Sequence, residues 1–195
     1  MKKLLITGFD PFGGESVNPS WEAVKLLPET IGSWHLTKLE IPTVFDKAYT
    51  QVLEMARQIQ PDAILSVGQA GGRSAITPEV VGINLREASI ADNAGNLATG
   101  QSIRENGPAA YFATVPVRAM VENIRKNQLP ASLSYSAGAF VCNDVLYSLL
   151  HHFSGSAVQV GFIHVPFLPQ QAKEGVPSLT LEQIVTGLTA AIEAM

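Results

Sequence analysis

Short apolar runs alternate with amphipathic segments along most of the chain. The three strongest runs, residues 4–7, 63–67 and 158–165, each end at a glycine or a proline, as buried strands often do. Weaker runs with strand character lie between the helical segments. Strands are therefore predicted at residues 4–7, 34–41, 63–67, 80–85, 133–137 and 158–165.

The segments between these runs have the spacing of amphipathic helices. Apolar residues such as Val145, Leu146 and Leu149 repeat at intervals of three and four, and Ser20 is a good N-cap for the first helix. Polar, glycine-bearing residues 90–106 predict a long loop. Helices are predicted at residues 21–27, 46–60, 116–126, 143–153 and 181–195, with a short one beginning at 108–111.

This order predicts an α/β protein with a largely parallel sheet and helices on both faces, because helical segments separate consecutive strands. In such sheets, functional groups gather at the carboxyl ends of the strands. We therefore expect a site built from the loop after Thr7, the loop after Val67, the residues around Cys142 and the turn after His164.

Composition narrows the range of functions. The 195 residues suit a single catalytic domain, 1–195, and 46% hydrophobic with 15% charged residues indicates a packed core. A net charge of −4 gives none of the basic surface of a nucleic-acid binder, so no nucleic-acid partner is expected. The apolar N-terminal run ends at Gly8, too early for a signal peptide, and no run could span a membrane. We expect a cytoplasmic protein.

Cys142 is the only cysteine, which excludes an internal disulfide and a cysteine zinc cluster. An isolated cysteine is usually a small buried apolar residue. Cys142, however, lies at the predicted start of a helix, where backbone N–H groups favour a thiolate. It is therefore a candidate nucleophile with a lowered pKa.

A cysteine nucleophile needs a base and a group that orients the base. His151 and His152 lie roughly 13 to 15 Å along the helix from Cys142 and are too far away. His164 ends a predicted strand, although such a histidine can also be a hydrogen-bonded core residue. Glu79 and Glu87 are both candidates for the orienting carboxylate, and either could be an ordinary surface residue.

The glycine-bearing segments after the first and third predicted strands could instead bind phosphate. Residues 8–14 do not have the spacing of a dinucleotide-binding loop, and neither segment ends in the Gly-Lys-Ser/Thr of a P-loop. Phosphate binding is therefore weakly indicated.

Four segments together resemble the pyrrolidone-carboxylate peptidase family, the type I pyroglutamyl peptidases. They are Leu-Ile-Thr-Gly-Phe-Asp-Pro-Phe-Gly-Gly at 5–14 with Asn-Pro-Ser-Trp at 18–21, Gly-Gln-Ala-Gly-Gly-Arg at 68–73 running on to 84, Ser-Ala-Gly-Ala-Phe-Val-Cys-Asn at 136–143, and Gly-Phe-Ile-His-Val-Pro-Phe-Leu-Pro-Gln-Gln at 161–171. The resemblance covers residues 5–171. It is specific because the segments occur together and in order.

The resemblance implies a three-layer α/β/α sandwich like that of nucleoside phosphorylases, and a cysteine peptidase that needs neither metal nor cofactor. It implies that Cys142, His164 and Glu79 form a catalytic triad. Our hypothesis for the mechanism is that Cys142 and His164 form a thiolate–imidazolium pair, oriented by Glu79, and that the reaction passes through an acyl-enzyme. The implied substrates are peptides with N-terminal pyroglutamate. Members are often homo-oligomers, so a dimer or tetramer is expected.

The substrate's terminal ring is a neutral lactam, which favours an apolar slot with a few hydrogen bonds. Phe9 and Phe12 match the family's pocket aromatics, although both could be core residues. Asn18 and Gln69 are candidate polar contacts, and Asn18 could simply be a turn residue before a proline.

Two positions depart from the family pattern. Val80 and Ser89 stand where the family usually has a basic residue and an arginine, and Arg86 or Arg73 could supply the missing charge. These departures leave open a catalytically silent protein that binds pyroglutamyl ligands. The fold resemblance leaves open a glycosyl-transferring phosphorylase, which would not need Cys142.

Overall fold

The computed structural model describes residues 1–195. Its helices are α1 (Pro19–Leu26), α2 (Lys47–Ile59), α3 (Val117–Lys126), α4 (Val141–His152) and α5 (Leu181–Glu193). Its strands are β1 (Lys2–Phe9), β2 (Thr30–Ile31), β3 (Trp34–Ile41), β4 (Ala63–Gln69), β5 (Thr77–Pro78), β6 (Val81–Ile83), β7 (Ala110–Phe112) and β8 (Gln159–Val165).

A six-stranded sheet with the order β2-β3-β1-β4-β8-β5 forms the centre of the molecule. The four inner strands β3, β1, β4 and β8 are parallel, and the two short outer strands β2 and β5 are antiparallel to their neighbours. β6 and β7 form a separate antiparallel pair. The largely parallel sheet predicted from the sequence is confirmed.

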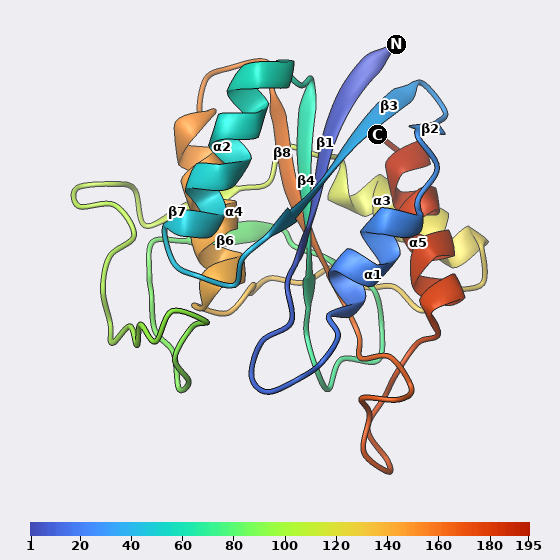
Figure 1. Ribbon diagram of the computed structural model, residues 1–195. Helices are drawn as coiled ribbons and strands as arrows, with labels where there is room; N and C mark the ends of the chain where they lie inside the picture. The colour runs from blue at the N-terminus through green and yellow to red at the C-terminus, as the bar shows by residue number, and fades with distance from the viewer.

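Helices cover both faces of this sheet, with α2 and α4 on one side and α1, α3 and α5 on the other (Figure 1). Because side chains alternate along a strand, each inner strand contributes to both cores. In β1, Leu4 and Ile6 join the cluster beneath α1, α3 and α5, whereas Leu5 and Phe9 join the cluster beneath α2 and α4. The three-layer α/β/α arrangement is therefore also confirmed.

Two predicted elements are wrong. Residues 108–111 do not begin a helix, because β7 forms there instead, with Tyr111 packed inward and its two neighbours exposed. Residues 133–137 are not a strand of the sheet. Ser134 pairs at one position only, as an isolated bridge with Glu79. In both places three or fewer residues pair with another strand. A segment this short is too short for its pattern of apolar and polar residues to distinguish a helix from a strand.

Two helix starts also differ from the predicted ones. The N-cap of α1 is Asn18, whose side-chain oxygen accepts a hydrogen bond from the Ser20 N–H, so Ser20 lies inside the helix. α4 begins at Val141, with Phe140 as its N-cap. Cys142 therefore lies in the first turn of α4 rather than before the helix. The predicted long loop at 90–106 contains no helix or strand.

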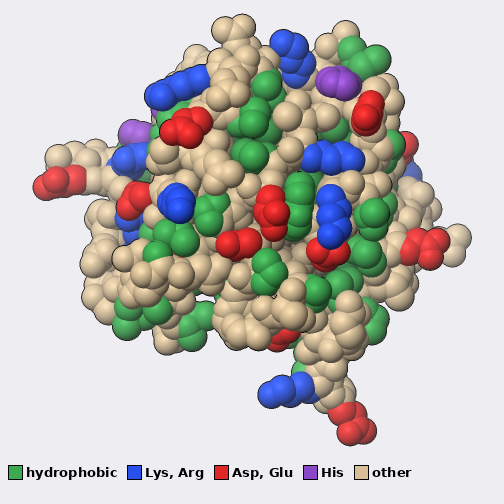
Figure 2. Space-filling model, in the orientation of Figure 1, with side chains coloured by type: hydrophobic (Ala, Val, Ile, Leu, Met, Phe, Trp, Pro, Cys, Tyr) green, Lys and Arg blue, Asp and Glu red, His purple; other side chains and the backbone are tan.

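Charged side chains are interspersed by sign over the face drawn in Figure 2, with no broad basic area. No helix combines the length and apolar character that crossing a membrane requires.

Candidate active site

The loops after β1, β4 and β8 meet at one edge of the sheet, at the lower end of the strands in Figure 1. One side chain from the turn after β8 joins the three loops. Gln171 Nε2 donates to Gln69 Oε1 at 3.0 Å, to Val17 O at 3.2 Å and to Glu15 Oε2 at 3.4 Å. The predicted gathering of these loops at the carboxyl ends of the strands is confirmed.

Cys142 is the second residue of α4 and is half-buried. Its sulfur lies over Gly68 in β4, so close that a β-carbon on Gly68 would come within 2.9 Å of Sγ. The first hydrogen bond of the helix runs from Asp144 N to Phe140 O. The N–H groups of Val141, Cys142 and Asn143 come before it and therefore have no acceptor within the helix. The thiol thus lies between a glycine of the sheet and the donor-rich end of a helix.

His164 lies next to this position on the neighbouring strand. In the parallel β4–β8 pair, Gly68 is the register partner of His164. Both positions face α4, because Gly68 lies four residues after Ile64 and His164 two residues after Phe162, and both of those residues belong to the core beneath α2 and α4. Imidazole Nδ1 is hydrogen-bonded to Glu79 Oε1 at 2.7 Å, and both side chains are almost completely buried. The structure therefore brings the nucleophile, base and carboxylate candidates to one place.

Glu79 is held there by the sheet and by an arginine. It follows β5, and its N–H donates to Phe162 O, which fixes the backbone beside β8. Arg73 Nη1 donates to the same Oε1 at 2.7 Å. The alternative carboxylate, Glu87, is exposed and its N–H donates to Ala139 O. Of the two predicted candidates, only Glu79 contacts the histidine.

The electrostatics of this group differ from those expected. Burial, reinforced by the negative charge of Glu79, raises the pKa of the Cys142 thiol to about 12. Burial also lowers the pKa of His164, although the Glu79 carboxylate opposes this shift. For Glu79, burial acts to raise the pKa, but hydrogen bonds from His164 and Arg73 hold it below its usual value.

These directions give a thiol, a neutral imidazole and an ionised carboxylate in the resting protein. The expected thiolate–imidazolium pair stays a prediction, and burial shifts both pKa values toward the uncharged forms. Helix-start N–H groups alone do not compensate for the surrounding apolar atoms. Because Glu79 is ionised, it accepts the Nδ1–H of His164 and leaves Nε2 as the free base.

The two predicted pocket aromatics lie in different surroundings. Phe9 is 2% exposed and packs against Phe162, with ring centroids 6.2 Å apart, so it belongs to the core beneath the site. Phe12 is half-buried and packs 6.1 Å from Phe140, the N-cap of the helix that carries Cys142. Only Phe12 presents a partly open ring beside the nucleophile. The aromatic partners Phe140 and Phe162 were not predicted as part of the site.

The two predicted polar contacts both stabilise loops. The buried Asn18 side chain accepts hydrogen bonds from the N–H and hydroxyl of Ser20 and donates to Asp10 O. Gln69, half-buried at the end of β4, accepts from Gln171. Both residues shape the wall of the site, and Gln69 is the better placed to reach a ligand because its side chain is partly open.

Neither position that departs from the family pattern forms a hydrogen bond with Cys142, His164 or the Glu79 carboxylate, although Val80 directly follows Glu79. Val80 contributes backbone hydrogen bonds to Ser134 and Ala113, and Ser89 is exposed in the segment that follows Arg86. Of the two arginines considered as substitutes, Arg86 pairs with Asp46 and Asp144, whereas Arg73 pairs with Glu79. Arg73 is therefore the arginine at the site. No group of three or more His, Cys, Asp or Glu side chains is arranged to hold a metal ion.

Comparisons with known proteins identify the family. The family model described as pyroglutamyl peptidase matches residues 2–195. The pyrrolidone-carboxylate peptidase of Levilactobacillus brevis is 52% identical, over 99% of this chain and 97% of its own length. That of Clostridium perfringens is 48% identical, over 99% and 92%.

Solved structures show the same similarity. The crystal structure of Bacillus amyloliquefaciens pyroglutamyl peptidase I superimposes with a TM-score of 0.96 at 47% identity, covering 100% of this chain and 96% of that one. The pyrrolidone carboxyl peptidase of Thermococcus litoralis gives a TM-score of 0.95 at 36% identity, covering 100% and 93%.

Proposed function

The chain belongs to the pyroglutamyl peptidase family, a family of cysteine peptidases, and we propose that it removes N-terminal pyroglutamyl residues with Cys142 as nucleophile, His164 as base and Glu79 as the orienting carboxylate. The observation that carries the assignment is the 2.7 Å contact between His164 Nδ1 and Glu79 Oε1, on the strand beside the glycine that Cys142 Sγ covers.

The resting thiol and neutral imidazole indicate general-base attack rather than attack by a preformed thiolate. Cys142 Sγ forms a bond to the pyroglutamyl carbonyl carbon while its proton passes to His164 Nε2. Glu79 holds the imidazole in the required tautomer and stabilises the positive charge that the ring gains. The buried site makes this stabilisation strong, because little water screens the carboxylate.

The free N–H groups in the first turn of α4 are placed to receive the negative charge that develops on the carbonyl oxygen. The N–H groups of Val141, Cys142 and Asn143 all precede the first bond of the helix. As the tetrahedral intermediate collapses, the carbon–nitrogen bond breaks and Nε2–H protonates the leaving amine. Water, deprotonated by the same nitrogen, then hydrolyses the thioester and releases pyroglutamate.

The lactam ring is neutral, so its recognition requires shape and a few hydrogen bonds rather than a counter-charge. The half-buried ring of Phe12 packs against Phe140, the N-cap of the helix that carries Cys142, and supplies an apolar surface for the lactam. Phe9 supports the site from below through Phe162, whose ring centroid lies 4.7 Å from that of His164. We assign the polar contact with the ring to Gln69, whose side chain is half-buried at the end of β4.

Substrate selectivity tests this function. The assay compares a fluorogenic pyroglutamyl amide with the matching prolyl amide. The pyroglutamyl ring has a carbonyl beside its nitrogen and is neutral, whereas the prolyl ring lacks this carbonyl and its nitrogen is positively charged. We expect release of the fluorophore from the pyroglutamyl amide and little from the prolyl one. Equal release from both would contradict a lactam pocket. Release that iodoacetamide leaves unchanged would mean that the amide is cleaved without Cys142. No release from a folded protein would favour a silent pyroglutamyl-binding protein or a glycosyl-transferring phosphorylase.

We further propose that residues 1–195 act as one catalytic domain, in the cytoplasm, as a homo-oligomer. The family match spans almost all of these residues. A catalytic thiol needs a reducing compartment to stay reduced. The dimer or tetramer rests on the family resemblance, and light scattering of the purified protein measures it directly.

A further inference from the structure

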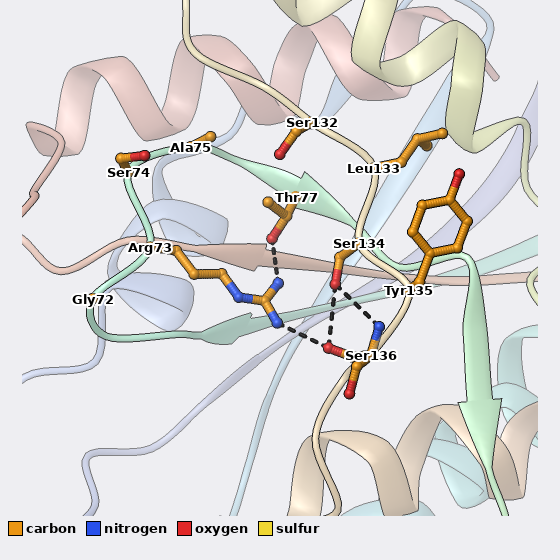
Figure 3. A pocket seen from close by; sticks show the side chains of 10 residues that line it. All are labelled: Gly72, Arg73, Ser74, Ala75, Thr77, Ser132, Leu133, Ser134, Tyr135 and Ser136. Atoms are coloured by element: carbon orange, nitrogen blue, oxygen red, sulfur yellow. Dashed lines mark hydrogen bonds between the residues drawn. The ribbon is translucent and has the colours of Figure 1, made fainter.

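Arg73 joins the parts of the site to one another, and nothing in the assignment above gives it a role. It lies in the loop between β4 and β5. Its guanidinium donates to Thr77 Oγ1 at 2.5 Å, to Glu79 Oε1 at 2.7 Å and to Ser136 O at 2.9 Å. Figure 3 shows the side chain extending from its loop toward Thr77 and Ser136.

The contact with Glu79 determines how the carboxylate is held. Oε1 receives both His164 Nδ1 and Arg73 Nη1, each at 2.7 Å, whereas Oε2 is buried with no hydrogen-bond partner. Ser134 lies beside the carboxylate and helps to lower its pKa, but its hydroxyl donates to Ser136 O at 3.2 Å. Arg73 and His164 are therefore the two side chains that lie at 2.7 Å from the carboxylate and fix its Oε1.

The contact with Ser136 reaches the segment that carries the nucleophile. Residues 134–140 lead directly into α4, and Cys142 is the second residue of that helix. Two backbone contacts tie this segment to the rest of the protein: the isolated bridge of Ser134 with Glu79, and the hydrogen bond from Glu87 N to Ala139 O. The planar guanidinium of Arg73 thus connects the Glu79 carboxylate to the segment that precedes α4.

Arg73 does not face the reacting atoms. It lines an open cavity of about 590 Å³ together with Gly72, Ser74, Ala75, Thr77 and residues 132–136. Neither Cys142 nor His164 belongs to the lining of this cavity. The arginine side chain is 29% exposed, so the cavity solvates it on the side away from the buried Glu79.

We propose that Arg73 is a positioning residue for the reaction: it holds Glu79 and the segment before α4 in the arrangement that lets Glu79 orient His164. This proposal rests on the triad proposed above. Glu79 and Arg73 are the charged groups that act on His164 and on Cys142. Removing the arginine therefore changes the electrostatics of the base as well as its geometry.

The test compares Arg73→Gln, Arg73→Lys and the exposed control Arg118→Gln on α3, by kcat, KM, the pH profile of kcat/KM and thermal unfolding. For Arg73→Gln we expect kcat to fall roughly 10- to 100-fold with KM little changed, because a positioning residue does not touch substrate. The acid limb of the profile, set by His164, moves to higher pH, since the positive charge that lowers the pKa of His164 is gone.

Arg73→Lys separates charge from geometry. Lysine keeps the positive charge but cannot form the planar set of contacts. We expect an acid limb near that of the wild type and a kcat between those of the wild type and Arg73→Gln. Arg118→Gln should match the wild type throughout.

Three results would overturn the proposal. The first is an Arg73→Gln enzyme whose kcat and acid limb both match those of the wild type. The second is an Arg73→Gln enzyme with a raised KM and an unchanged kcat. The third is an Arg73→Gln enzyme whose activity falls only in step with its thermal stability, with no shift of the acid limb. If Arg73→Gln does not fold, Arg73→Lys decides, and a wild-type kcat in that variant would refute the role. The proposed function has its own tests, loss of all activity in Cys142→Ala for the nucleophile and the fall of kcat in Glu79→Gln for the carboxylate, so failure of this inference is distinguishable from failure of the proposed function.

Discussion

The sulfur of Cys142 lies over the α-carbon of Gly68, with space for hydrogen but not for a methyl group. A β-carbon at this position would come within 2.9 Å of Sγ and within 2.8 Å of the Phe162 ring. The strand beneath the nucleophile therefore has to carry a glycine. The same strand position is the register partner of His164, so the close approach also sets the nucleophile beside its base.

Gly68→Ala tests this contact. The added methyl group must displace either the thiol or the Phe162 ring, and such overpacking costs about 1–3 kcal/mol of stability. Displacement of the sulfur should lower kcat by roughly 100-fold, because small errors in the position of a reacting atom are costly. Thermal unfolding and steady-state kinetics measure the two effects.

Ser66→Ala is the matched control for Gly68→Ala. Ser66 lies two residues earlier on the same face of β4, and its buried hydroxyl has no hydrogen-bond partner. Removing that hydroxyl should leave activity intact and stability unchanged or higher. A Gly68→Ala enzyme as active and stable as Ser66→Ala would show that the sulfur is not confined by the strand.

The protonation state of Cys142 predicts how the thiol reacts with iodoacetamide. Because burial raises its pKa to about 12, the thiolate fraction, and with it the alkylation rate, should rise continuously from pH 7 to pH 10. A small free thiol with a pKa of about 8.5 serves as the reference, since its rate levels off within this range. An alkylation rate for Cys142 that is constant from pH 6 upward would instead indicate a preformed thiolate–imidazolium pair.

Glu79→Gln tests the orienting carboxylate. The amide cannot stabilise the imidazolium that forms when His164 takes the thiol proton, so kcat should fall roughly 100-fold or more. Glu87→Gln is the control, because Glu87 is exposed and does not contact His164. Steady-state kinetics near pH 7.5 distinguishes them, and equal activity in the two variants would remove Glu79 from the mechanism.

Arg86 stabilises the helix that carries Cys142 through a buried ion pair. Its Nε donates to Asp144 Oδ1 at 2.8 Å, and the Asp144 side chain is 0% exposed. Arg86→Gln leaves this carboxylate without a counter-charge, which should lower the free energy of unfolding by about 3 kcal/mol. Burial already raises the pKa of Asp144, so the unpaired group should take up a proton.

Asp46→Asn is the control for Arg86→Gln, since the Asp46 side chain is 68% exposed. Loss of an exposed partner should cost less than about 1 kcal/mol. Chemical denaturation of both variants gives the comparison. A similar small loss in each would mean that Asp144 does not depend on Arg86.

Much of this site could be predicted from the sequence because parallel strands bring their carboxyl ends to one edge. That rule correctly placed the turn after His164 beside the loop after Val67. Cys142 was expected at the same edge after a strand at 133–137, which the structure does not contain, and it reaches this edge at the start of α4 instead. Helix geometry correctly excluded His151 and His152. His151 instead contacts Tyr111 at 2.9 Å, far along α4 from the nucleophile. Long, regular elements made both predictions possible.

The remaining features depend on contacts between distant segments. The choice between Arg73 and Arg86 could not be made from spacing, because it depends on which carboxylate each side chain meets in the folded chain. The raised pKa of Cys142 depends on burial by several elements, whereas the sequence indicated only the start of a helix. The short strand β7 could not be told from a helix start because it is three residues long.

The central claim is that Cys142 forms a covalent acyl-enzyme with the pyroglutamyl group. The most direct measurement mixes excess protein with a fluorogenic pyroglutamyl amide, quenches in acid within the first turnover, and maps the modified peptide by mass spectrometry. Our account predicts a pyroglutamyl group on the peptide that contains Cys142, and neither adduct nor fluorophore release in a folded Cys142→Ala variant. Fluorophore release by Cys142→Ala at the wild-type rate would contradict it.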